Sequence, residues 1–383
     1  MAQNAPQTQT ISSRLDKAGD SPAVRGGGKK VLVGLSGGVD SAVSLWRLHR
    51  QGFETIGVIF KLWRFPCGDV RQDNIFRSGG EIEAAESLCR RLKVPLLIED
   101  VSEQFFEQVV KNFAAEYRRG RTPNPCVLCN PGIKWDNLLA IAERIGADFV
   151  ATGHYARILR RPDEGFNLLR GADTAKDQSY FLYRLTQRHL SRTLFPIGHL
   201  TKSQTRQIAA RYGLPISSPR ESQEICFLPC GNLEDFFRRF IPEATQPGPI
   251  YDLSGRRVGT HRGIAFYTIG QREGLGGGFP TKMYVLKILP GENAIVVGPG
   301  EYLLRTTFTV ADLNWIRRVK FPLRATVRIR HRHKDSPAII TKLSEDKVQV
   351  EFEAPQRAIT PGQSAVFYDG LIVLGGGIID EVL

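Results

Sequence analysis

Two spacings of apolar side chains alternate along the first part of the chain. Short apolar runs predict buried strands at 31–35, 55–60, 96–98 and 148–152. Apolar residues three and four positions apart predict helices between these runs, within 42–48, 82–92, 105–117 and 138–145. Strands that alternate with helices are typical of a parallel sheet with helices on both faces. The pattern therefore predicts an α/β domain.

The pattern changes after residue 215. Proline and glycine become denser across 242–249, and short β-rich runs separated by turns follow at 284–289, 294–297, 306–310, 323–329, 338–343, 348–352, 364–367 and 371–374. Short strands at close, even spacing favour a small antiparallel β-barrel. We therefore expect four segments along the chain: a polar, disordered leader at 1–29, the parallel-sheet α/β domain at 30–215, a small central domain at 216–282 and a C-terminal β-barrel at 283–383.

Composition indicates what kind of partner the protein binds and in which compartment it works. The 383 residues include 52 Lys and Arg against 39 Asp and Glu, a net charge of +13, and this excess favours a polyanionic partner. No apolar run is long enough to span a membrane, and the first 29 residues lack the apolar stretch of a secretory signal. We therefore expect a cytoplasmic protein whose six cysteines are reduced.

A glycine-rich loop, GLSGGVDS, follows the first predicted strand at 34–41. Adjacent glycines let consecutive N–H groups point at an anion, and the following helix adds the positive end of its dipole. Ser36 and Ser41 can donate hydroxyl hydrogen bonds, and Asp40 can hold a magnesium ion on the phosphates. Without a lysine after the glycines this is not a Walker loop, but it resembles the loop of enzymes that split ATP into AMP and pyrophosphate. Thr152-Gly153-His154 ends another predicted strand, so both segments are expected at one sheet edge.

Four of the six cysteines are candidates for chemistry: Cys126, Cys129, Cys226 and Cys230. Three interpretations remain open: a thiol pair for sulfur or disulfide chemistry, a zinc site made of all four, or an iron–sulfur cluster held by three. The prolines of 122–130 predict an extended loop around the first pair. A sulfur-carrying thiol should be accessible and have a low pKa. Cys67 and Cys89 are interpreted as small core residues.

A basic stretch lies within the predicted barrel. Residues 313–334 contain no acid and eight basic residues: Arg317, Arg318, Lys320, Arg324, Arg328, Arg330, Arg332 and Lys334. The last four alternate, so on a strand they would share one face. Such a row can follow a phosphate backbone, and the alternative is a solvated edge strand protected by charge.

In this order, the motifs resemble those of the tRNA-specific 2-thiouridylase family over nearly all of 30–383. The matching segments are GLSGGVDS at 34–41, GRTPNP at 120–125, Cys129-Asn130, ATGHYAR at 151–157, KDQSYFLY at 176–183, EICF at 224–227, Gly270-Gln271-Arg272, TPGQSAVFYDG at 360–370 and LGGGII at 374–379. The resemblance implies an N-terminal ATP-pyrophosphatase catalytic domain, a small central domain and a tRNA-binding C-terminal barrel.

The resemblance also implies a reaction, ATP-dependent 2-thiolation of the wobble uridine of tRNA, with Mg²⁺ and a sulfur donor protein such as a cysteine desulfurase or a sulfur relay protein. ATP makes the C2 oxygen a leaving group by adenylation, and a persulfide on Cys226 delivers sulfur. Cys129 attacks the persulfide or closes a disulfide with Cys226, and Asp40 completes the catalytic set. The implied ATP contacts are Gly34, Leu35, Ser36, Gly37, Gly38, Val39, Asp40, Ser41, Phe60 and Gly153. The implied tRNA contacts are Asn124, Pro125, Cys126, His154, Lys176, Asp177, Gln178, Arg330, His331 and Gln363.

The chain departs from the family pattern at three positions. Cys126 and Glu221 stand where many members have Asp, and Pro131 stands where many have Lys. With Cys129 and Cys226, the thiol of Cys126 could hold a 4Fe–4S cluster, as in related cluster-dependent tRNA thiolases. This is the alternative to the favoured persulfide route. An ATP-dependent ligase acting on a small molecule and a non-catalytic tRNA-binding protein are the alternatives from other classes.

Overall fold

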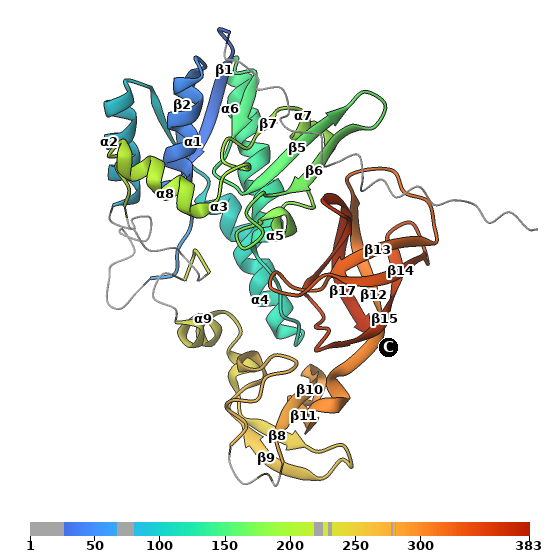
Figure 1. Cartoon of the computed structure of the whole chain (residues 1–383). Coiled ribbons are helices and arrows are strands. Elements are labelled where there is room, and N and C mark those ends of the chain that lie inside the picture. The colour runs from blue at the N-terminus through green and yellow to red at the C-terminus, as the bar shows by residue number, and fades with distance from the viewer. Residues whose placement is uncertain (1–26, 67–79, 218–224, 229–231, 277–278, 280) are drawn as a thin grey trace, which may run out of the picture.

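The computed structural model describes residues 27–66, 80–217, 225–228, 232–276, 279 and 281–383, and these residues form three sheets. The parallel sheet lies at one end of the molecule, the small central sheet at the other, and the C-terminal barrel beside them (Figure 1). The expected leader up to residue 26, Cys67, Glu221 and Cys230 lie outside the described residues. In the part of the chain that the structure describes, no helix has the length and apolarity to cross a membrane.

The N-terminal sheet is parallel, as predicted. Its strand order is β3-β2-β1-β4-β7, formed by β1 (Lys30–Leu35), β2 (Glu54–Lys61), β3 (Leu96–Asp100), β4 (Phe149–Ala151) and β7 (Thr193–Leu194). Side chains of β1 alternate between two cores: Val31 and Val33 pack with α1 (Val39–Arg50) and α2 (Glu81–Leu92), whereas Leu32 packs with α6 (Asp136–Arg144). From β1 the chain continues to β2 and β3 on one side, and it then returns to form β4 on the other side of β1. The carboxyl end of β1 is therefore a switch point, where such sheets bind ligands.

Two long helices connect this sheet to the rest of the molecule, and both contain π-helical turns. The first consists of α3 (Ser102–Phe105), η3 (Phe106–Val110) and α4 (Lys111–Arg118), and the second of α5 (Cys126–Leu128), η4 (Cys129–Trp135) and α6.

The expected extended loop is wrong from Cys126 onward, where the second helix begins. Pro125 sits at the N-cap, where a helix needs no N–H group. Pro131 has no N–H to donate, and the helix widens around it, so that the N–H of Asp136 donates to the carbonyl oxygen of Pro131 five residues back.

The central sheet has the order β10-β11-β8-β9, from β8 (Gly248–Tyr251), β9 (Arg257–His261), β10 (Met283–Leu289) and β11 (Ala294–Pro299). The expected boundary at residue 283 differs from this arrangement, because β10 and β11 form a hairpin that pairs with β8 instead of joining the barrel. The change between sheets occurs at η9 (Gly300–Leu303). Strand patterns alone do not say which sheet a hairpin joins.

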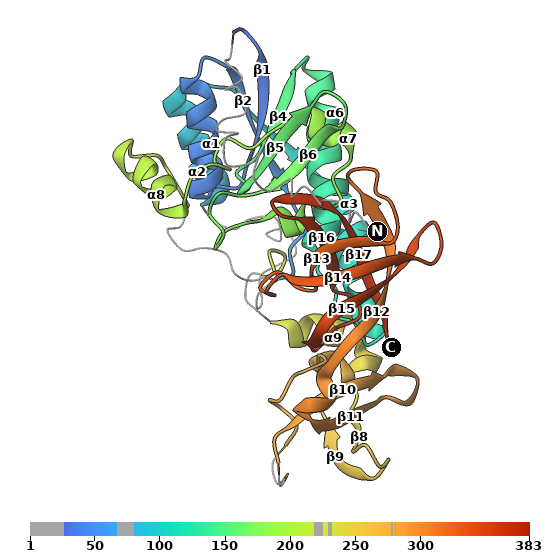
Figure 2. The same ribbon diagram turned by 45° about the vertical axis from the view of Figure 1, so that its right-hand side comes forward.

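Six C-terminal strands close into the predicted antiparallel barrel: β12 (Leu304–Trp315), β13 (Leu323–Arg328), β14 (Ser336–Lys342), β15 (Lys347–Arg357), β16 (Ser364–Asp369) and β17 (Ile372–Val382). Strand β12 pairs with both β15 and β17, which closes the ring (Figure 2). A hairpin of the N-terminal domain, β5 (Ala156–Arg161) and β6 (Gly165–Arg170), extends the barrel sheet through the pairing of Leu169 with Ile372. The barrel is thus joined to the N-terminal domain by backbone pairing.

The remaining helices are short. They are α7 (Gln187–Ser191), α8 (Lys202–Arg211), α9 (Leu233–Phe240) and the 3₁₀ turns η5 (Ser179–Phe181), η6 (Pro242–Thr245), η7 (Ile264–Phe266) and η8 (Pro290–Glu292).

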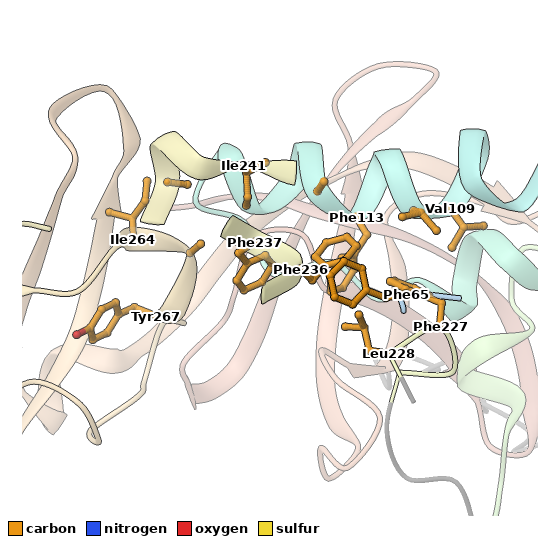
Figure 3. Close-up of a cluster of buried hydrophobic side chains, with 14 of the residues drawn as sticks. Phe65, Val109, Phe113, Phe227, Leu228, Phe236, Phe237, Ile241, Ile264 and Tyr267 are labelled. Atoms are coloured by element: carbon orange, nitrogen blue, oxygen red, sulfur yellow. The ribbon is translucent and has the colours of Figure 1, made fainter. Parts of the chain in front are cut away.

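A core of aromatic side chains joins the first long helix to α9 and to residues 225–228 (Figure 3). The Phe113 ring lies 5.3 Å from Phe227 and 5.7 Å from Phe236, measured between ring centroids. The carbonyl oxygen of Phe227 also accepts a hydrogen bond of 2.7 Å from the backbone N–H of Phe65. Cys226 therefore stands directly before a residue that is fixed in the core.

We expect Phe227→Ala to lower the free energy of unfolding by about 3–5 kcal/mol, because it leaves a cavity in this core. Urea unfolding followed by tryptophan fluorescence measures the change, since Trp63 lies 6.3 Å from the Phe227 ring. Leu343→Ala is the control: its side chain is 54% exposed, so the change should stay within about 0.5 kcal/mol. Equal effects of the two substitutions would contradict the anchoring role of Phe227.

Candidate functional site

The glycine loop begins where β1 ends and turns directly into α1. Gly37 has a φ of +73°, and a Cβ there would lie 2.7 Å from the Cα of Glu81, so glycine is required by both conformation and space. Gly38 is the N-cap of α1 and has no side chain to cap the first N–H groups. The hydroxyl of Ser41 accepts a hydrogen bond from the Ser36 N–H at 3.2 Å, which closes the loop. The first turn of a twelve-residue helix thus presents N–H donors to an anion.

Asp40, in this first turn, is engaged by two other side chains. The Nζ of Lys202 lies 2.8 and 2.7 Å from its two carboxylate oxygens, and the hydroxyl of Tyr155 donates to one of them at 2.8 Å. The Tyr155 hydroxyl oxygen also lies 3.0 Å from the Thr205 hydroxyl, and desolvation raises the pKa of Tyr155 well above its usual range. The carboxylate of Asp40 is the type of oxygen ligand that magnesium takes together with substrate phosphates. The loop therefore fits a magnesium-bound polyphosphate.

The second strand end meets this loop, as expected from the parallel sheet. A Cβ on Gly153 would lie 2.6 Å from the Ser41 nitrogen, so the backbones of β4 and α1 are in close contact. Desolvation, and then the charge of Lys134, lower the pKa of His154 well below its usual range, and its Nδ1 lies 2.8 Å from the Thr152 hydroxyl. Phe60, at the end of β2, packs against the core below α6 and against the aromatic core around Phe113 and Phe227. All the implied ATP contacts therefore lie at the carboxyl ends of β1, β2 and β4.

Three thiols act on one another electrostatically. The charges of Cys129 and Cys126 raise the pKa of the Cys226 thiol. The ammonium group of Lys134 lowers the pKa of all three thiols. The helix that carries Cys126 and Cys129 also packs beside the glycine loop, because the ring of Trp135 lies 5.4 Å from that of His154, measured between centroids. Cys129 is buried, Cys126 and Cys226 are exposed, and all three are free thiols, as is the buried Cys89.

The expectation of a low thiol pKa is wrong for this structure. Desolvation raises the pKa of Cys129 to about 11 and that of Cys226 to about 12, and it raises the pKa of Cys126 as well. The positive charge of Lys134 lowers these values but does not compensate for desolvation. Of the three thiols only Cys129 is buried, whereas Cys226 is exposed although its pKa is raised, and sequence spacing cannot show either property.

The fit to a metal centre is incomplete. Thiolates are suitable ligands for an iron–sulfur cluster. Within the described ranges, however, no three Cys, His, Asp or Glu side chains are arranged to hold a metal ion. The thiols as placed do not form a preassembled cluster site, and a four-cysteine zinc site would need Cys230, which is outside these ranges.

The segment before Cys126 is fixed by local and barrel contacts. The side-chain oxygen of Asn124 accepts a hydrogen bond from the Cys126 N–H at 3.1 Å, and the carbonyl oxygen of Pro125 accepts one from Cys129 at 3.0 Å. The Gln363 side chain donates to the carbonyl oxygen of Thr122 at 2.7 Å. Gln363, implied as a tRNA contact, therefore connects the barrel to the segment that precedes the helix with Cys126 and Cys129.

Asp177 is not placed to contact tRNA through its side chain. Only 2% of Asp177 is exposed; its carboxylate accepts backbone hydrogen bonds from Gly171 at 3.0 Å and Ser179 at 3.1 Å. Arg170 and Arg328 lie 3.7 and 3.4 Å from the same carboxylate. The sequence gives no sign of this, because buried and exposed aspartates look alike.

The structure also confirms only part of the expected row of four exposed cations. Strand β13 ends at Arg328, which turns inward to Asp177 and Asp335 instead of facing solvent. Arg330, Arg332 and Lys334 lie in the turn that follows and are exposed. Three of the four expected cations are thus available to a polyanion.

The other implied tRNA contacts line the junction of the two domains. His331 lies 3.2 Å from the Asp177 carbonyl oxygen and stacks near Phe181, with ring centroids 4.6 Å apart. The side chain of Gln178 accepts a hydrogen bond from the Tyr155 N–H at 2.9 Å. Lys176 borders a cavity at the start of α8. These residues therefore lie where the glycine loop, β4 and the barrel meet.

Sequence reasoning missed Lys202, Tyr155 and Lys134. The start of α8 was detectable, because Thr201 and Gln204 form a capping box around Lys202. Lys134 follows Cys129 by five residues, a spacing that becomes relevant only when the helix is known to be π-helical, with hydrogen bonds five residues apart. Nothing in the sequence paired Lys202 with Asp40.

Together, an anion-binding loop at the switch point of a parallel sheet, adjacent thiols and a closed C-terminal barrel define an ATP-pyrophosphatase-type α/β protein. Comparison with known proteins agrees. Residues 29–230 match the tRNA methyl transferase HUP domain, 234–299 the tRNA methyl transferase PRC-barrel domain, and 305–379 the aminomethyltransferase beta-barrel domain.

The tRNA-specific 2-thiouridylase of Caldanaerobacter subterraneus subsp. tengcongensis is 44% identical over 358 residues, which cover 92% of this chain and 98% of that protein. The enzyme of the same name from Acidithiobacillus ferrooxidans is 43% identical over 359 residues, which cover 92% and 98%. The chain therefore belongs to the tRNA-specific 2-thiouridylase family.

The raised thiol pKa predicts the pH dependence of alkylation. Because only the thiolate reacts, iodoacetamide labelling of Cys226 should rise about tenfold per pH unit and continue to rise above pH 9, whereas an ordinary thiol of pKa about 8.5 levels off there. Peptide mass spectrometry measures the rates. In Lys134→Met the rise should move to higher pH, since a positive charge is removed. A Cys226 rate that levels off below pH 9 would show that desolvation does not control this thiol.

Proposed function

We propose that this chain catalyses ATP-dependent 2-thiolation of the wobble uridine of tRNA, with sulfur carried by a persulfide on Cys226. The observation that carries the proposal is the packing of the helix that holds Cys126 and Cys129 against the end of β4 beside the glycine loop, where the ring centroids of Trp135 and His154 lie 5.4 Å apart. This arrangement supports a single site for activation by ATP and for sulfur transfer. The names of the relatives, which cover nearly the whole chain, agree with it.

The reaction has two chemical steps. The uracil C2 oxygen attacks the α-phosphorus of ATP, and pyrophosphate leaves while N–H groups at the start of α1 and the hydroxyls of Ser36 and Ser41 hold the phosphates. The terminal sulfur of the Cys226 persulfide then attacks C2. AMP leaves with the former C2 oxygen, because adenylation has made that oxygen a good leaving group.

The sulfur must then separate from the protein. The Cys129 thiolate attacks the Sγ of Cys226, the sulfur–sulfur bond of the adduct breaks, and its electron pair stays with the sulfur on the base. A Cys129–Cys226 disulfide remains, and an external thiol reduces it before a donor protein supplies the next persulfide. The mutual influence of the two thiols supports this pairing. The disulfide, the donor and a cytoplasmic location remain predictions from the sequence.

A 4Fe–4S cluster on Cys126, Cys129 and Cys226 is the alternative for the sulfur step. The presence of a third thiol, Cys126, within reach of the other two favours it. The absence of a three-ligand metal geometry among the described side chains favours the persulfide route. Magnesium would be held by Asp40 on the phosphates, which neutralises their charge.

Cysteine substitutions test the sulfur chemistry. Cys129→Ser and Cys226→Ser should each remove 2-thiouridine from tRNA, measured by mass spectrometry of digested tRNA, while pyrophosphate release continues, since adenylation needs neither thiol. Cys89→Ala is the control, because this buried thiol packs in the core of the parallel sheet. Thiolation that persists in either serine variant would exclude the proposed pair. Turnover of ATP that does not respond to tRNA would instead indicate a ligase acting on a small molecule.

Cys126→Asp separates the two sulfur routes. On the persulfide route the variant stays active with a persulfide donor, and the parent purifies colourless under anaerobic conditions. A parent that is brown, contains about four irons per cluster and uses inorganic sulfide would establish the cluster route, and Cys126→Asp should then lose iron because a soft ligand is removed.

The exposed turn after β13 should contact tRNA phosphates. Replacing Arg330, Arg332 and Lys334 by Gln should weaken tRNA binding and reduce the log–log salt slope by about 0.7–0.9 per lost contact. ATP affinity should not change. Arg328→Gln is the comparison: its guanidinium group pairs with Asp177 and Asp335, so it should lower thermal stability and leave the salt slope almost unchanged. An unaltered slope in the triple variant would mean that this turn is only a solvated loop.

A further inference from the structure

Lys202 reaches Asp40 of the glycine loop from the start of another helix, α8. It is the first residue of α8, whose start is fixed by the Thr201–Gln204 capping box. Its backbone N–H donates to the Asp173 carboxylate at 2.9 Å. The side chain is only 10% exposed, and its ammonium group makes contact with both oxygens of Asp40 at 2.7 and 2.8 Å.

This contact competes with a metal ion. Magnesium binds through carboxylate oxygens and substrate phosphates, and in this structure both Asp40 oxygens are engaged by an ammonium group. A divalent cation and an ammonium group on one carboxylate repel each other. Binding of magnesium by Asp40 therefore requires Lys202 to release at least one oxygen.

A destination for the released ammonium group lies beside it. A cavity of about 620 Å³ is lined by Lys202 together with Lys176, Ser203, Arg206 and Gln207. It is open to solvent, and its charged lining is basic. Tyr155 limits the movement on the other side, since its ring centroid lies 5.8 Å from the Lys202 nitrogen and its hydroxyl is bound to Asp40.

We propose that Lys202 is a positioning residue of the adenylation step: it pairs with Asp40 before magnesium and ATP bind, and then moves towards the adjoining cavity and onto the polyphosphate that the start of α1 holds. The inference rests on the proposed function for the identity of the nucleotide. The exchange keeps the charge of Asp40 compensated at every stage, first by an ammonium group and then by the cation. It also places a positive charge where the leaving pyrophosphate develops negative charge.

Two measurements on the full chain test this exchange. The first uses Mn²⁺ alone as a probe of Asp40, followed by electron paramagnetic resonance. Lys202→Met should bind Mn²⁺ about tenfold or more tightly than the parent, since the competing cation is gone. Lys202→Arg, which keeps the charge, should bind it as weakly as the parent. Asp40→Asn should lose the site in either background.

The second measurement is tRNA-dependent pyrophosphate release at saturating ATP and magnesium. Lys202→Met should be slower on the order of 10²-fold, and Lys202→Arg should recover most of the rate, because a cation again reaches the phosphates. Lys111→Met is the matched control, since Lys111 forms a surface ion pair with Glu107 at 2.7 Å, and both readouts should equal those of the parent. Thermal unfolding checks that each variant is folded.

The outcomes are separable. Unchanged Mn²⁺ affinity in folded Lys202→Met would overturn the exchange, and a parental rate of pyrophosphate release would overturn the role in adenylation. A purely structural role would lower both Mn²⁺ affinity and rate together. If the proposed function were wrong, the parent protein would form no 2-thiouridine in tRNA. The Mn²⁺ measurement does not depend on that result.

Discussion

A cluster of four charged side chains, of which Arg170 and Asp177 are buried, joins the barrel to the N-terminal domain. Asp177 and Asp335 face Arg170 and Arg328, and Arg170 also lies over the Tyr368 ring with its guanidinium carbon 3.6 Å from the centroid. Two positive and two negative charges balance, and removal of one would leave a buried charge without its partner. Because Asp177 lies between Lys176 and Gln178, this cluster fixes the segment that borders the ATP site.

A second set of contacts joins the barrel to the segment that precedes Cys126 and Cys129. Gln363 and Arg121 tie the barrel to the segment before the second long helix: Gln363 donates to the Thr122 carbonyl oxygen, and Arg121 donates to the Ile379 carbonyl oxygen at 3.0 Å. That helix begins at Cys126 and places Cys129 one turn later. The barrel is thus coupled to the segment around Asp177 and, through Thr122, to the helix that carries Cys126 and Cys129.

Sequence reasoning reached the fold because its evidence is local. The alternation of Val31, Leu32 and Val33 between two cores requires helices on both faces of the sheet, and the glycine loop needs only its own strand and helix. Long-range pairing was not accessible in this way. The pattern could not show that β10 and β11 join the central sheet, that Arg328 turns inward, or that Lys202 reaches Asp40 across 162 residues. The extended loop failed at Cys126 because proline is tolerated at a helix start.

The carboxylate of Asp40 and the thiols share one property in this structure: the surroundings of each group suppress its free negative charge. The carboxylate of Asp40 is compensated by Lys202, and desolvation keeps the protons on Cys129 and Cys226. Each group becomes reactive only when another charge enters: a metal-bound polyphosphate for Asp40, and for the thiols a change in the water and charge around Lys134. On the proposed function, activation by ATP and transfer of sulfur would then be linked to occupancy of the same site. A thiol that stays protonated until then is also protected from oxidation, because the thiolate is the form that reacts.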